Sequence, residues 1–373
     1  MHVVVLGAGY AGVALTRALE DRLPPEVELT VVDERETHLV QHLVHRAIRY
    51  PDLAEELTVP FGELFDRATH RQARIAGLDH DAGHVDLADG SLSYDVGALA
   101  VGARTAYYGL PGVEAHATPL KRLRHAEQIR SAFLDVCATG GRAVVGGAGL
   151  SGIQVAGELA ALADERGSDA EVVLVEREPT VAPAFPERFR RAVAEELTAR
   201  DVTVRLDRAV EAVDADAVRF AGGETLAYDQ LVWTGGIAGG DATGGERPVV
   251  PATLRLGERT FAVGDAARVV DSDGEAVPAS AQTAVREASV AAANVGRLVD
   301  HRRAGSEGFE PRLDRYGYTS LGWLVSVGDG AVAQIGPSVL RGPAATAAKE
   351  TVAAGYLGNI GAVERALAYV REA

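Results

Sequence analysis

The chain has 373 residues, too many for one ordinary domain, and its 47% hydrophobic content is typical of a globular protein. Its net charge of −16 argues against a nucleic-acid partner, because neutralising phosphates requires clustered lysine and arginine. A single cysteine, Cys137, excludes chemistry that needs a redox-active pair within the chain, such as disulfide reduction.

Two further features bear on where the protein works. Lys121 and Lys349 are the only lysines among 37 basic residues. This acidic, arginine-rich composition resembles that of halophilic proteins from salt-rich cytoplasm, and a GC-rich genome explains the arginine bias equally well. No run of about 18 apolar residues predicts a membrane span. The chain begins directly with a strand-like segment at residues 1–6, which leaves no room for a signal peptide, so we expect a cytoplasmic protein.

The chain opens with a predicted strand, a glycine-rich turn, a helix and a second strand that ends in an acidic residue. We expect these elements at residues 3–6, 7–12, 13–23 and 29–32, followed by Asp33 and Glu34. The turn has the pattern GxGxxG. Its first glycine permits a tight turn, its second lets the backbone approach a pyrophosphate, and its third lets helix and strand pack closely. The pattern predicts a dinucleotide site.

The same arrangement recurs 140 residues later. Its strand, turn, helix and second strand are expected at 143–145, 147–152, 153–165 and 172–175, and the second strand ends at Glu176. Repetition in the same setting predicts two nucleotide-binding halves. An acid at such a strand end accepts hydrogen bonds from an adenosine ribose and repels the additional phosphate of NADP, so Glu176 favours NADH. The adjacent Arg177 softens that preference.

A third signature follows much later in the chain. Residues 260–263 are expected to form a buried strand that ends at Gly264 and Asp265, where a carboxylate can accept hydrogen bonds from a ribityl chain. A long helix is expected at 279–298 after Pro278, and its amino-terminal dipole favours negative charge on a reduced flavin. The alternative is a turn and a packing helix. Together with the repeat, this signature predicts FAD in the first half.

With these residues in place, the chain resembles the type II NADH dehydrogenases, single-subunit enzymes of the two-dinucleotide-fold flavoprotein superfamily, over roughly residues 1–300. The resemblance rests on DERETHLVQHLVH at 33–45, VGAR at 101–104, GLPGV at 109–113 and VWTGG at 232–236. It implies an α/β fold of two Rossmann-like domains with a C-terminal α+β segment. The FAD domain would comprise 1–112 and 235–300, the inserted NADH domain 113–234, and the C-terminal segment 301–373.

The resemblance also implies an activity and its contact residues. Hydride would pass from NADH to FAD, and the electrons would then pass to an acceptor, foremost a quinone. The expected FAD contacts are Gly7, Gly9, Tyr10, Ala11, Gly12, Asp33, Glu34, His42, Gly102, Gly264, Asp265 and Gln282. The expected NADH contacts are Gly147, Gly149, Leu150, Ser151, Gly152, Glu176 and Gly235.

Three residues are catalytic candidates: Gln154, Gln282 and Arg286. The family usually has a glutamate at the position of Gln154, and glutamine cannot carry a proton, which puts an acid–base role there in doubt. Glu158 lies one helical turn further on. The family's quinone-associated pattern has two glutamines four residues apart, and here Gln282 is retained while Arg286 replaces the second. This change alters the polarity expected at a quinone ring and would suit a different acceptor.

The remaining features leave alternatives open. His38, His42 and His45 match no zinc spacing, so we expect no metal; they are flavin-loop residues, with His42 or His45 able to deliver a proton, or solvated loop residues. Residues 318–328 are expected to form a strand over the flavin. The apolar stripe at 347–370 predicts a helix, which we expect to pack in the core or a homodimer, with peripheral membrane docking as the alternative.

Two other functions remain compatible with the sequence. The enzyme could reduce a soluble acceptor such as a small iron–sulfur protein instead of quinone. Alternatively, the chain could be a sensor in which NADH slowly reduces a bound flavin and the oligomeric state changes. Sulfide oxidation is disfavoured because it needs more than one cysteine.

Overall fold

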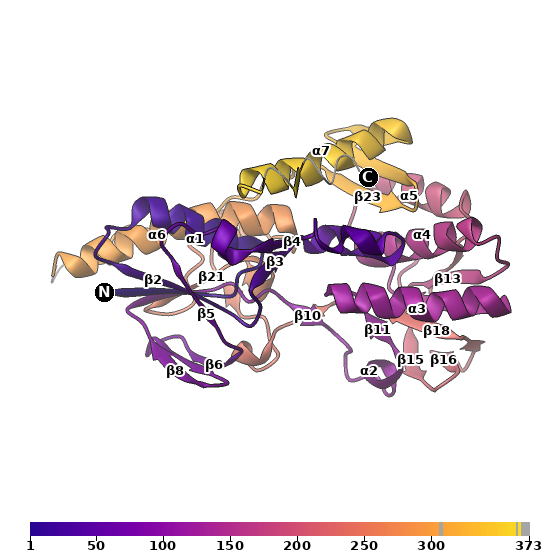
Figure 1. Cartoon of the computed structure of the whole chain (residues 1–373), viewed down its shortest axis with the longest axis horizontal. Coiled ribbons are helices and arrows are strands. Elements are labelled where there is room, and N and C mark those ends of the chain that lie inside the picture. Colours follow the sequence, from indigo (N-terminus) through magenta and orange to yellow (C-terminus); the bar gives the residue numbers. More distant parts are fainter. Residues whose placement is uncertain (306–308, 363–364, 367–373) are drawn as a thin grey trace.

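The computed structural model describes residues 1–305, 309–362 and 365–366. Two five-stranded parallel sheets lie side by side along the long axis, each with helices packed against it (Figure 1). A C-terminal unit, yellow in the figure, extends across both halves. The expected α/β class with two dinucleotide-binding folds and a C-terminal segment is therefore confirmed.

The first sheet is built from strands at both ends of the first 262 residues, in the order β21-β9-β1-β2-β5. Its strands are β1 (His2–Leu6), β2 (Glu28–Asp33), β5 (Thr69–Gln72), β9 (Val96–Leu99) and β21 (Thr260–Ala262). Helices α1 (Tyr10–Arg22) and α6 (Ala281–Arg303) pack against each other beside it. Helix α6 begins later than expected because Ser280 and Thr283 form a reciprocal capping box.

The second sheet repeats this plan in the order β11-β18-β12-β13-β14. Its strands are β11 (Thr118–Pro119), β12 (Arg142–Gly146), β13 (Glu171–Val175), β14 (Thr203–Arg205) and β18 (Gln230–Trp233). Its helices are α3 (Leu123–Thr139), α4 (Leu150–Glu165) and α5 (Glu187–Thr198). In both sheets the central strand is almost fully buried, as expected for a parallel sheet covered on both faces.

Each half also carries a small antiparallel sheet. The strands are β6 (Ile75–Asp79), β7 (His84–Leu87) and β8 (Gly90–Ser93) in the first half, and β15 (Val210–Val213), β16 (Ala217–Phe220) and β17 (Thr225–Ala227) in the second. The chain crosses between the halves at β10 (Arg104–Thr105) and returns at β19 (Ile237–Ala238), which pair antiparallel between the two sheets (Figure 1). Helix α2 (Val113–His116) follows the first crossing. The domain limits given above remain a prediction.

Short elements complete the two halves. They are the strands β3 (Thr37–Leu39), β4 (Thr58–Pro60), β20 (Val249–Val250) and β22 (Arg268–Val269), and the 3₁₀ helices η1 (Gln41–Ile48), η2 (Pro51–Ala54), η3 (Phe61–Glu63), η4 (Asp241–Thr243) and η5 (Gly264–Ala266). Among the described residues, no helix is both long and apolar enough to cross a membrane.

The C-terminal unit is a three-stranded antiparallel sheet with one helix. It comprises β23 (Trp323–Val327), β24 (Gly330–Ile335), β25 (Ser338–Arg341) and α7 (Pro343–Asn359). The strand expected at 318–328 was placed too early, because Gly322 takes a left-handed φ of +122° and residues 309–322 are irregular. Of the apolar stripe, Ile360 is buried and Tyr356 half-buried, but Val352 is exposed, because the buried face of α7 is formed by Ala353 and Leu357 instead. The last positions of the stripe, 363, 367 and 370, lie outside the described residues.

Candidate functional site

The two glycine turns have almost the same geometry. Gly7 and Gly147 take left-handed φ values of +100° and +95°, which favour glycine. The amide of Gly7 donates to the carbonyl of Val32 at 2.7 Å, and that of Gly147 donates to the carbonyl of Val175 at 2.8 Å. Each turn is therefore anchored to the neighbouring strand that ends in an acid.

The second and third glycines of each turn serve different purposes. A Cβ on Gly12 or on Gly152 would overlap the carbonyl oxygen of the first glycine of its own turn, so only glycine permits this packing. A Cβ on Gly9 or Gly149 would meet no described atom within 4 Å. The second glycine thus borders open space, as expected where a ligand approaches the backbone.

Each turn leads directly into a helix. Gly9 and Gly149 are the N-caps of α1 and α4, and no described side chain caps either helix. The N–H groups of the first turn are therefore free to bind an anion. The first two helical residues are Tyr10 and Ala11 in α1, and Leu150 and Ser151 in α4.

The two acids close the turns in the same way. Oδ2 of Asp33 accepts a hydrogen bond from the Ala8 amide at 2.8 Å, and Oε2 of Glu176 accepts one from the Ala148 amide at 2.7 Å. Both carboxylates are buried. Burial opposes ionisation of Asp33, but the Arg35 guanidinium and the amides of Ala8 and Arg35 outweigh it and hold the pKa of Asp33 below its usual range.

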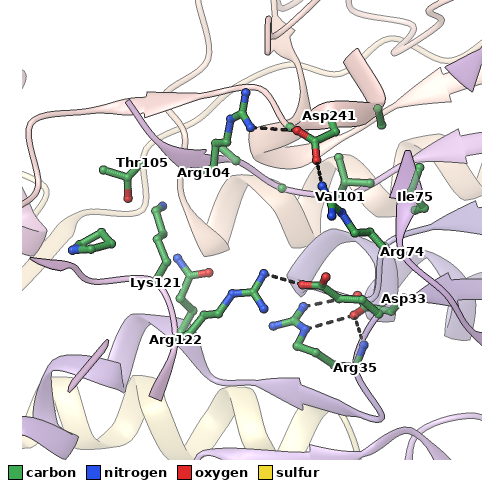
Figure 2. Close-up of a pocket in the computed structure, with 18 of the residues that line it drawn as sticks. Asp33, Arg35, Arg74, Ile75, Val101, Arg104, Thr105, Lys121, Arg122 and Asp241 are labelled. Atoms are coloured by element: carbon green, nitrogen blue, oxygen red, sulfur yellow. Dashed lines mark hydrogen bonds and ion pairs between the residues drawn. The ribbon is translucent and has the colours of Figure 1, made fainter. Parts of the chain in front are cut away.

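A cleft of about 660 Å³ opens at the carboxyl end of the first sheet (Figure 2). Three ion-paired groups lie in its wall: Arg35 binds Asp33 at 3.1 Å, Arg122 binds Glu34, and Asp241 lies between Arg74 (2.5 Å) and Arg104 (2.9 Å). Gly7, Asp33 and Gly102 also line it. Six cationic side chains face the cleft although the chain is acidic, which suits a ligand with phosphates; they are Arg35, Arg74, Arg104, Lys121, Arg122 and Arg124.

Asp265, in η5 shortly after β21, interacts electrostatically with Lys121. Oδ1 of Asp265 is buried and has no hydrogen-bond partner among the described residues. Burial lowers the pKa of Lys121, and the charge of Asp265 opposes this shift. The Gly264 amide donates to Glu287 at 2.6 Å, and burial raises the pKa of Glu287 to about 7. The unpartnered Oδ1 of Asp265 is therefore available to accept hydrogen bonds from ligand hydroxyl groups.

The three catalytic candidates do not form one cluster of contacts. Gln282 lies in the first turn of α6, and Gln154 lies on α4, one turn after its start. The guanidinium of Arg286 donates to the carbonyl of Thr319 at 2.6 Å. Arg286 therefore ties α6 to the irregular segment 309–322.

A buried polar cluster beneath the C-terminal unit was missed by the sequence analysis. Lys349 of α7 donates to Nε2 of His45 at 2.9 Å and also to the Ser326 hydroxyl. Glu158 is fully buried, 4.0 Å from His45 and 3.5 Å from Arg49. Burial raises the pKa of Glu158 to about 7 and lowers that of Lys349 to about 7. The one available signal was a rare lysine beside an apolar helical stripe.

His38 and His45 are buried and His42 is half-buried, so the alternative of solvated loop residues was wrong for His38 and His45. The Tyr10 hydroxyl donates to Nδ1 of His42 at 2.5 Å, and the Tyr356 hydroxyl donates to Nε2 of His38 at 2.8 Å. Burial lowers the pKa of His38 to about 4 and that of His42 to about 3, so both rings are neutral at pH 7. Helix α7 thereby contacts the first glycine turn.

The doubled fold and its paired turns define the class of NAD(P)H-dependent flavoprotein oxidoreductases with two dinucleotide-binding folds. A model of the pyridine nucleotide-disulphide oxidoreductase family matches residues 1–288, and the chain belongs to this family. The single cysteine means that no intrachain disulfide can form.

The sequence identity to individual relatives is low. The chain is 27% identical to a demethylphylloquinone reductase from Synechocystis, covering 94% of this chain and 91% of the relative. It is 25% identical to a type II NADH:quinone oxidoreductase from Staphylococcus aureus, covering 87% and 89%. The structure of NDH2 from Plasmodium falciparum in complex with NADH has a TM-score of 0.83 at 15% identity, covering 99% of this chain and 97% of that one. The last comparison concerns the fold alone.

Proposed function

We propose that this chain oxidises NADH through bound FAD and passes the electrons to a quinone. The observation that carries the proposal is the pair of equivalent turns at Gly7 and Gly147. Each turn leads into a helix without a side-chain cap and donates an amide hydrogen bond to the carboxylate at the end of the neighbouring strand. The two relatives at 27% and 25% identity, a demethylphylloquinone reductase and an NADH:quinone oxidoreductase, support the choice of acceptor.

The residues of the first half fit FAD. Gly9 leaves space for a pyrophosphate at the start of α1, Asp33 is positioned for the adenosine ribose, and the orphaned oxygen of Asp265 can accept from ribityl hydroxyls. Bound FAD would supply the hydride-accepting and electron-releasing chemistry. The protein would hold and orient the FAD, and the segment around His42 would exclude water from it.

The second half fits NADH better than NADPH. Glu176 occupies the strand end where an extra phosphate on the adenosine ribose would be repelled. Arg177, which could attract that phosphate, instead pairs with Glu178 at 3.2 Å. These contacts support NADH as the electron donor.

Quinone reduction consumes protons as well as electrons, and Gln154 cannot supply one. Lys349 and Glu158 are buried groups whose pKa values burial brings to about 7, and they adjoin the His42–His45 loop. We assign proton supply on the acceptor side to this cluster. The ammonium of Lys349 would hold the proton, His45 would contact it directly, and the charge of Glu158 would favour its protonated form.

A quinone dissolved in a bilayer would require the protein to approach a lipid surface. Leu321, just before the C-terminal unit, and Ile335 and Val352 within it are 60%, 55% and 60% exposed. We propose that these three apolar side chains make a peripheral membrane contact. Vesicle flotation tests this part: the wild type should float with vesicles, and replacement of the three residues by serine should abolish flotation.

An acceptor panel tests the activity. The FAD-loaded protein is assayed for NADH oxidation with a soluble menaquinone analogue, with a small iron–sulfur protein and without an acceptor. Turnover with the quinone well above that with the other two supports the proposal. Turnover only with the iron–sulfur protein would overturn the quinone assignment, and a protein that retains no flavin would overturn the whole proposal.

A further inference from the structure

The topology of the second sheet separates the two ends of a bound dinucleotide. Strand β12 lies between β13, which ends at Glu176, and β18, which is followed by Gly235. With the pyrophosphate at Gly149 and the adenosine ribose at Glu176, the nicotinamide end must extend toward the end of β18. This assignment rests on the proposed NADH site.

An aromatic side chain lies at that end of β18. The hydroxyl of Tyr108 donates to the carbonyl of Gly235 at 3.1 Å, and a Cβ on Gly236 would overlap that hydroxyl. Gly235 in turn adjoins the glycine turn, since a Cβ on Gly147 would lie 2.8 Å from its Cα. Tyr108 therefore flanks the approach to the NADH turn from the nicotinamide side.

Packing does not account for the position of Tyr108. Its side chain is 62% exposed, and its backbone takes a left-handed φ of +55°, which non-glycine residues rarely adopt. The adjacent Tyr107 behaves differently, because it packs against the hydrophobic core of the second half. A large exposed ring held on a strained backbone is a feature that folding alone does not favour and that ligand sites often show.

The backbone close to Tyr108 is tied to the second sheet, and the hydroxyl bond to Gly235 holds the end of the ring. The Ala106 amide donates to the carbonyl of Gly236 at 3.0 Å, and the indole of Trp233 donates to the carbonyl of Ala106 at 2.8 Å. Tyr108 is thus two residues from a segment tied to both β18 and the returning crossing strand β19. A ring held this way loses little further freedom on binding a ligand.

We propose that Tyr108 is a contact residue for the nicotinamide half of NADH. Its ring offers a flat apolar surface to the nicotinamide ring, whereas the adenosine half is bound by Glu176 on the other side of β12. Removing the ring should therefore weaken ligands that carry nicotinamide and should leave ligands that lack it unaffected.

Calorimetric titration of the oxidised, FAD-loaded protein tests this with two ligands, NAD⁺ and ADP-ribose, which lacks nicotinamide. Tyr108→Gly removes the ring and suits the left-handed backbone, while Tyr108→Phe keeps the ring and removes the hydroxyl. We expect Tyr108→Gly to weaken NAD⁺ by about fivefold, as for loss of one aromatic contact, and to leave ADP-ribose unchanged. Tyr108→Phe should bind both ligands about as the wild type does.

Three results with the variants would overturn the inference. They are unchanged or tighter NAD⁺ binding by Tyr108→Gly, a parallel loss for ADP-ribose, and a loss by Tyr108→Phe equal to that by Tyr108→Gly, which would assign the effect to the hydroxyl. A wild type that binds ADP-ribose but no NAD⁺ would also overturn it. If the wild type binds neither ligand, the proposed function fails as well. This result differs from the others, which overturn only the role of Tyr108.

Discussion

Lys349 and His45 are joined by a hydrogen bond of 2.9 Å, although 304 positions separate them in the chain. The contact connects α7 to the loop that follows the first sheet's acidic strand end. Three further charged groups surround it: Arg46 of η1, Arg49 directly after η1, and Glu158 of α4. Because these groups are buried, their protonation is coupled to one another more strongly than it would be at the surface.

Glu158→Gln should shift the pH dependence of the acceptor half-reaction. The Glu158 carboxylate favours the charged form of Lys349, so its loss lowers the pKa of Lys349 further below about 7. The rate of flavin reoxidation by quinone, followed across pH 5.5–8.5, should then fall off at lower pH than in the wild type. Glu165→Gln is the matched control, because Glu165 also pairs with Arg49 but is partly exposed. Superimposable profiles for Glu158→Gln and the wild type would exclude this cluster as the proton supply.

The sequence predicts features that are set within a few residues better than features that depend on long-range contacts. The turns at Gly7 and Gly147 were predictable because a tight turn, a close backbone approach and a helix start are all set within a few residues. The burial of His45 was not, because it depends on Ser326 and Lys349, which tertiary packing brings from the other end of the chain. The start of β23 was misplaced because the left-handed Gly322 breaks the extended conformation expected across 318–328.

Gly9→Ala and Gly149→Ala should each disable one nucleotide site without unfolding the protein. Both glycines have negative φ values, and an added Cβ meets no described atom within 4 Å, so the ligand-free fold should melt at an unchanged temperature. A methyl group would occupy the space of a pyrophosphate. We expect Gly9→Ala to lose FAD, and Gly149→Ala to keep FAD and bind NAD⁺ at least about tenfold more weakly. Equal loss of both ligands in either variant would contradict the separation of the sites.

Glu287→Gln should stabilise the protein at alkaline pH. Burial raises the pKa of Glu287 from 4.5 to about 7, so the wild type carries the full cost of the buried charge above pH 7 and none below about 4.5. Glutamine still accepts from the Gly264 amide. The free energy of unfolding of the variant should exceed that of the wild type by roughly 1–3 kcal/mol at pH 8, with the difference vanishing toward pH 4.5. A constant difference across this range would assign the effect to packing.

Glu176→Gln should weaken the preference for NADH. Glutamine keeps an acceptor near the Ala148 amide but removes the charge that repels an additional phosphate. We expect kcat/KM for NADH to fall about fivefold, since a hydrogen bond to a charged group becomes one to a neutral group, and kcat/KM for NADPH to rise. Glu171→Gln is the control, because that carboxylate lies at the opposite end of β13 and pairs with Arg142. An unchanged ratio in Glu176→Gln would mean that donor choice is set elsewhere.

The most direct test of the central claim is one anaerobic absorbance trace of the purified, FAD-loaded protein. NADH is added first, and a soluble menaquinone analogue follows after the flavin band has bleached. The account predicts rapid bleaching by NADH and rapid, complete recovery on addition of the quinone. Bleaching without recovery would contradict quinone as the acceptor, and a flavin band that NADH leaves unchanged would contradict the proposed function itself.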